Sequence, residues 1–136
     1  MKIAVIDDEN DYREIVRLHL ELDDHQVLEA ADGLQGLEMI RKERPDLVIT
    51  DLNMPHLNGA EMIERLKVDD SHLGLIPCFL LSGNIDQTEK TRLLNSGVDQ
   101  CFDKTISFSF DIALLISPEM ASSTFPHELF SPFFIG

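Results

Sequence analysis

Residues 47–55 read LVITDLNMP, an apolar run followed by a polar turn that opens with Asp51. A second apolar run, IAVI at residues 3–6, ends in the acidic residues 7–9. Short apolar runs bounded by polar turn residues are typical of strands that are buried on both faces of a parallel sheet. The two runs therefore predict two strands of such a sheet.

Three carboxylates follow these expected strands directly: Asp7, Asp8 and Asp51. Ligands of parallel α/β sheets bind outside the carboxyl ends of the strands, so we expect all three side chains at one edge of the sheet, which we call the rim. Crowded carboxylates repel one another and raise one another's pKa values unless a cation lies among them. Hard oxygen ligands with room for water and a phosphate are typical of magnesium, so the sequence predicts a magnesium site.

Strand-like and helix-like segments alternate along the chain. The expected strands lie at residues 2–6, 25–29, 46–50, 76–81 and 98–102, and the expected helices at residues 11–22, between 33 and 45, at 59–68 and at 86–95. In the first helix, Ile15, Leu18 and Leu22 are spaced for one buried face. Strands that alternate with helices of this length predict right-handed βαβ units and a parallel, doubly wound α/β sheet.

The composition excludes several classes of protein. The chain has 136 residues, enough for one domain, and a net charge of −14 that disfavours direct contact with nucleic acid. Cys78 and Cys101 lie in apolar or strand-like segments and indicate free thiols in a reducing compartment. The sequence shows no signal-peptide pattern and no apolar run of about 18 residues, so we expect a cytoplasmic protein without membrane contact.

The composition changes after Lys104. Residues 105–136 contain no Lys or Arg and hold six of the eight Phe residues, and prolines at 118, 126 and 132 disfavour a regular helix there. We therefore expect a domain at 1–117, whose last helix is the short apolar segment 110–116, and a tail at 118–136. Large exposed apolar surfaces mark contacts, so we expect a partner contact or a homodimer through the face between the fourth and last helices.

Two more polar side chains follow expected strands: Ser82 after 76–81 and Lys104 after 98–102. With them, the sequence resembles the receiver domain of two-component response regulators over about residues 2–116. The matching segments are VIDDE at 5–9, DLNMP at 51–55 with Gly59, LLSG at 80–83 and FDK at 102–104. The resemblance implies a flavodoxin-like, doubly wound five-stranded parallel sheet with strand order 2-1-3-4-5 and helices on both faces.

The resemblance also implies how the acidic residues act. Asp51 would be the nucleophile that takes a phosphoryl group from a sensor histidine kinase or a histidine phosphotransfer protein, which gives an aspartyl phosphate. Magnesium would be held by Asp8, Asp51 and the backbone carbonyl of Asn53, with Asp7 acting through a water. The implied cofactor is therefore Mg²⁺, and the implied partners are proteins of a phosphorelay.

The remaining matched residues have implied roles in the response. Lys104 would pair with the phosphate, and the Ser82 hydroxyl would donate a hydrogen bond to it. Ser82 and Phe102 would form a switch, in which the aromatic ring turns inward as the hydroxyl shifts toward the phosphate. Lys104 is followed by Thr105 where the family usually has a cis proline; a cis bond without proline costs about 3 kcal/mol, so the geometry of this peptide stays open.

Other interpretations compete with this one. Each rim residue taken alone fits a helix cap, a turn or a solvated surface position, and only their joint occurrence at successive strand ends favours a phosphoacceptor. A receiver-like module that binds partners without phosphorylation is the main alternative. A phosphatase with an aspartyl phosphate needs a second acid two residues after the nucleophile, where Asn53 stands. We therefore expect a stand-alone receiver that catalyses only its own phosphorylation and dephosphorylation and signals to a protein partner.

Overall fold

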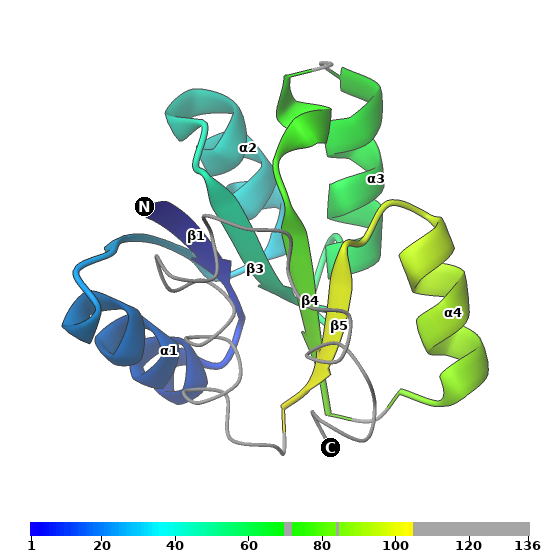
Figure 1. The fold of residues 1–136 in the computed structure, drawn as a ribbon, viewed down its shortest axis with the longest axis horizontal. Coiled ribbons are helices and arrows are strands. Elements are labelled where there is room, and N and C mark those ends of the chain that lie inside the picture. Colours follow the sequence, from blue (N-terminus) through cyan, green and yellow to red (C-terminus); the bar gives the residue numbers. More distant parts are fainter. Residues whose placement is uncertain (70–71, 84, 105–136) are drawn as a thin grey trace.

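The computed structural model describes residues 1–69, 72–83 and 85–104 (Figure 1). Over these ranges, strands and helices alternate as the sequence predicts. The order is β1 (Lys2–Ile6), α1 (Asn10–Leu22), β2 (Gln26–Ala30), α2 (Gly33–Glu43), β3 (Leu47–Asp51), α3 (Gly59–Asp69), the 3-10 helix η1 (Leu73–Leu75), β4 (Cys78–Ser82), α4 (Gln87–Asn95) and β5 (Gln100–Asp103). The expected helix at 110–116, the domain edge at 117, the tail at 118–136 and the Lys104–Thr105 peptide lie outside the described residues.

The strands form one parallel sheet in the order β2-β1-β3-β4-β5, which confirms the predicted fold class and strand order. Ile6 of β1 pairs with Thr50 of β3, and Asp51 pairs with Leu81 of β4. Because these pairs are the last or next-to-last residues of their strands, the carboxyl ends of β1, β3 and β4 lie level at one edge. This edge is the rim that the sequence predicts.

Helices cover both faces of the sheet. α1 packs on one face through Val16 and Leu20, and α2, α3 and α4 pack on the other (Figure 1). Every residue of β3 and β4 is buried, as expected for central strands with helices on both sides. Burial of each large aliphatic side chain contributes roughly 1.5–3 kcal/mol, so the central strands hold the rim in place.

The predicted buried face of the first helix is wrong. Ile15, Leu18 and Leu22 are 50%, 48% and 81% exposed, whereas Val16 and Leu20 are fully buried. Both sets are spaced for a single helical face, and the periodicity of the sequence fixes the helix but not its rotation. The contact with the sheet selects the second set.

Two strands begin two residues later than predicted, and the other strand boundaries agree to within one residue. β4 begins at Cys78, not at residue 76, since Pro77 has no N–H to donate and only its carbonyl joins the ladder, accepting from Val48 N at 2.9 Å. β5 begins at Gln100, two residues later than expected. Both cysteines in the described residues are buried free thiols. Across the described ranges, no helix is long and apolar enough to cross a membrane.

Candidate functional site

The ends of β1 and β3 bring three carboxylates together. Asp7 and Asp51 are 1% and 5% exposed, and Asp8 is exposed. One carboxylate oxygen from each of the three lies within 4.8 Å of those of the other two. Three hard, anionic oxygen ligands at this spacing fit a divalent cation such as magnesium, with Asp8 open to solvent on the outer side.

Lys104 lies against these carboxylates. Its Nζ atom is 2.8 Å from Asp7 Oδ2, 3.4 Å from Asp51 Oδ2 and 3.3 Å from Glu9 Oε1. The Lys104 side chain is only 11% exposed, and its backbone N–H donates to the Ser82 carbonyl at 3.0 Å. The end of β5 therefore places an ammonium next to the buried carboxylate at the end of β3.

Burial and charge shift the pKa values of this group. Burial and the negative charge of Asp7 raise the pKa of Asp51 to about 6, although Lys104 acts in the opposite direction. Burial lowers the pKa of Lys104, but its hydrogen bond to Asp7 and the surrounding carboxylates raise it by more, so it lies above the usual value. Lys104 is thus protonated near neutral pH, and Asp51 is half ionised at about pH 6 in the metal-free protein.

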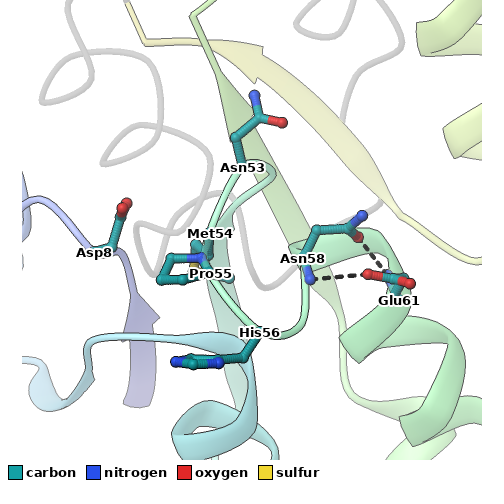
Figure 2. A pocket seen from close by; sticks show the side chains of 7 residues that line it. All are labelled: Asp8, Asn53, Met54, Pro55, His56, Asn58 and Glu61. Carbon is teal, nitrogen blue, oxygen red and sulfur yellow. Dashed lines mark hydrogen bonds between the residues drawn. The ribbon is translucent and has the colours of Figure 1, made fainter.

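The loop after β3 is fixed by its own hydrogen bonds. The Gly59 N–H donates to the Leu52 carbonyl at 2.9 Å. Asn58 and Glu61 bond reciprocally, each side chain accepting from the other's backbone N–H, at 2.8 and 3.1 Å (Figure 2). Such a capping box satisfies the first donors of α3. A Cβ atom at Gly59 would come 2.1 Å from the Asp51 carbonyl oxygen, so only glycine fits there.

A surface pocket of about 430 Å³ opens in front of this loop. Figure 2 shows Asp8 on one side of it, across from the loop that carries Asn53 and His56. Asn53 is exposed and lines this pocket together with Asp8; its expected role as a carbonyl ligand stays a prediction. His56 is exposed and has a φ of +70°, a left-handed conformation.

The two expected switch residues do not share a face of the sheet. Ser82 is 2% exposed and pairs with Asp103, whereas Phe102 pairs with Leu81. Side chains alternate along a strand, so Phe102 faces the α1 side and Ser82 faces the α4 side. The Phe102 ring already packs edge-on against Phe79, with centroids 5.6 Å apart. Its switch role stays a prediction.

The sequence pattern assigns no role to two neighbours of Lys104, Glu9 and Tyr12. Both lie where β1 passes into α1, and the Tyr12 ring centroid is 4.5 Å from Lys104 Nζ. The available signal was their position: Glu9 is the last residue of the acidic cluster at 7–9, and Tyr12 follows it in the first turn of the first helix. That position places a side chain near the rim but does not say which partner it meets there.

Comparisons with known proteins agree with this geometry. Residues 3–111 match the model of the response regulator receiver domain family. Sporulation initiation phosphotransferase F of Bacillus subtilis is 33% identical over 95 residues, which are 70% of this chain and 76% of that protein. The sensor protein EvgS of Escherichia coli O157:H7 is 33% identical over 107 residues, 79% of this chain but only 9% of EvgS.

A solved structure is similar over most of its length. The response regulator receiver domain protein from Clostridium thermocellum superimposes with a TM-score of 0.77 and 27% identity, over 89% of this chain and 94% of that one. The family match, the identity to phosphotransferase F and the strand order all agree. The chain therefore belongs to the response regulator receiver domain family of two-component and phosphorelay signalling.

Proposed function

We propose that this receiver accepts a phosphoryl group on Asp51 and signals to a protein partner by a change of conformation. One observation carries the proposal: the buried Asp51 carboxylate lies 3.4 Å from the Lys104 ammonium and beside the carboxylates of Asp7 and Asp8. A nucleophile at a strand end, with a cation fixed next to it, is aligned for attack and for stabilisation of developing charge.

Phosphoryl transfer requires alignment and neutralised charge more than covalent help from the protein. In the proposed reaction, an Asp51 oxygen bonds to phosphorus while the phosphorus–nitrogen bond of a phosphohistidine breaks and histidine leaves. The donor is a sensor histidine kinase or a histidine phosphotransfer protein. Lys104 neutralises a phosphoryl oxygen, and the Ser82 hydroxyl donates a hydrogen bond to another. The chain promotes only its own phosphorylation and dephosphorylation.

The carboxylates also support a magnesium site. Asp8, Asp51 and the backbone carbonyl of Asn53 would hold the ion, and Asp7 would reach it through a water. Asp7 is already engaged by Lys104 at 2.8 Å, which agrees with an indirect role. Bound magnesium would supply positive charge to the phosphoryl oxygens.

We propose that the output is contact with a protein partner. We propose that the chain acts as a stand-alone receiver, since it covers 76% of phosphotransferase F, although only 9% of EvgS. We also propose a homodimer through the face between α4 and the helix expected at residues 110–116. The net charge of −14 favours a protein partner over nucleic acid.

Incubation with acetyl phosphate and magnesium tests the phosphoacceptor directly. The intact mass of the wild type should rise by one phosphate, and Asp51→Asn should stay unmodified. Asp46→Asn, a change at an exposed carboxylate before β3, is the matched control and should label as the wild type does. Labelling of Asp51→Asn at the wild-type rate would falsify the assignment.

A further inference from the structure

The Lys104 ammonium has a neighbour that the proposed phosphorylation does not use. Its Nζ atom lies 4.5 Å from the centroid of the Tyr12 ring. A cation within about 6 Å of an aromatic centroid is attracted to the negative face of the ring. We propose that Tyr12 is a positioning residue that holds the Lys104 ammonium beside Asp51, a role that rests on the proposed phosphorylation of Asp51.

A ring holds a cation differently from a carboxylate. Lys104 contacts Asp7, Glu9 and Asp51, and each of these carboxylates offsets its positive charge. The quadrupole of an aromatic ring attracts the ammonium without supplying a net negative charge. Tyr12 therefore restrains the flexible lysine side chain but leaves its charge available to an incoming phosphoryl group.

The structure gives the ring a firm support. Tyr12 lies in the first turn of α1 and packs against the apolar cluster between that helix and the sheet. Val16 and Leu20 follow it at intervals of four residues and are fully buried, so the side of α1 that carries the ring is fixed against the strands. A support of this kind keeps its place when the charges around Lys104 change.

The Tyr12 hydroxyl carries no negative charge near pH 7 that could attract Lys104. Burial raises the pKa of Tyr12 to about 12, with Lys104 acting against this, so the phenol is neutral near pH 7. Glu9 is a weaker candidate for the same task because its side chain is 68% exposed, and exposed ion pairs contribute little. The aromatic face of Tyr12 is therefore the feature to test.

Two substitutions at Tyr12 distinguish the effect of the aromatic ring from that of apolar bulk. Tyr12→Leu keeps an apolar side chain and removes the ring, and should slow phosphorylation by acetyl phosphate roughly threefold to tenfold at saturating magnesium. Tyr12→Phe keeps the ring and should rescue the rate. Leu18→Ala, at a 48% exposed position of the same helix, is the control and should label as the wild type does. Tyr12→Met replaces the leucine variant if that variant does not fold.

A double-mutant cycle distinguishes positioning from general damage. In a Lys104→Met background, Tyr12→Leu should cause no further slowing, because the cation that the ring holds is already gone. In the unphosphorylated protein, the ring current should shift the Lys104 Hε resonances upfield in the wild type and Tyr12→Phe, and this shift should vanish in Tyr12→Leu.

The outcomes are distinct. Equal slowing by Tyr12→Leu in both backgrounds, no rescue by phenylalanine or no ring-current shift overturns the positioning role. If the wild type is phosphorylated and Tyr12→Leu is phosphorylated at the same rate, the positioning role of Tyr12 is overturned but the proposed function is not. A wild type that takes up no phosphate overturns the proposed function, and the positioning role with it.

Discussion

The ends of β1 and β3 form the acidic half of the rim and the ends of β4 and β5 the switch half, and the backbone is closely packed at Gly59 in the first but open at Gly83 in the second. A Cβ atom at Gly59 would meet the Asp51 carbonyl oxygen at 2.1 Å, while one at Gly83 would meet nothing within 4 Å. Both halves border a pocket, of about 430 Å³ beside Asp8 and of about 170 Å³ beside Ser82, so the contrast lies in the backbone. The loop after Asp51 is therefore fixed at Gly59, whereas the loop after Ser82 has room to move at Gly83.

The first test of this comparison removes a carboxylate from the acidic half. Asp8→Ala should slow magnesium-dependent phosphorylation by more than about a hundredfold, because the ion loses its exposed ligand. The same change relieves repulsion with Asp7 and Asp51, so thermal stability without magnesium should stay equal or rise.

Phosphate incorporation and thermal unfolding measure the two effects of Asp8→Ala. Ser82→Ala serves as the control from the switch half and should still accept phosphate. Phosphorylation of Asp8→Ala at the wild-type rate at low magnesium would show that Asp8 is not a metal ligand.

The two glycines test the packing itself. Gly59→Ala should lower the free energy of unfolding by roughly 1–3 kcal/mol, since its methyl group displaces the backbone that carries Asp51. Gly83→Ala should change it by less than about 0.5 kcal/mol. Urea unfolding of both variants measures the contrast, and equal effects would show that the halves are packed alike.

The raised pKa of Asp51 predicts that the stability of the folded protein depends on pH. The carboxyl titrates at about pH 6 in the folded protein against 3.8 in its ordinary state, so ionisation disfavours the native fold. The wild type should therefore lose stability relative to Asp51→Asn as the pH rises from about 4 to 6, by roughly 1–2 kcal/mol in metal-free buffer.

Denaturation at pH 4 and pH 7.5 checks the sign of this effect. Magnesium should offset the loss at pH 7.5 if the proposed site binds it in the native wild type. A stability difference that does not change with pH would mean that the rim does not raise this pKa.

The smallest effect is expected in the switch half. Ser82→Ala should accept phosphate at nearly the wild-type rate but transmit it less, because only one hydrogen bond to the phosphoryl group is lost. The amide shifts of α4 and β5 on phosphorylation should shrink in NMR spectra. Lys104→Ala should reduce the same shifts. Unchanged shift patterns in both variants would contradict the coupling.

The sequence predicts the fold and the acidic half well because both depend on strand ends. The apolar runs before Asp7 and Asp51 define two strands, and parallel pairing alone brings their ends to one edge. The rotation of α1 escaped prediction, since Val16 and Leu20 are spaced as regularly as the set that was expected to be buried. Because the apolar residues of α1 are spread over more than one side, its periodicity does not decide which side meets the sheet.

The switch half was harder to predict for a related reason. A strand places successive side chains on opposite faces, so the partner of Ser82 depends on the register between β4 and β5 and not on distance along the chain. That register puts Asp103, and not Phe102, opposite Ser82. The approach of Tyr12 to Lys104 likewise joins positions far apart in sequence, and no local pattern encodes it.

The reaction rates of the two buried thiols report on opening of the sheet edge. Burial raises the pKa of Cys78 to about 12 and that of Cys101 to about 11, so alkylating reagents react slowly with either in the native state. Cys101 lines the small pocket beside Ser82, whereas Cys78 lies at the other end of a central strand. The rate of Cys101 alkylation relative to that of Cys78 therefore measures local opening of β5, and the experiment needs no introduced label.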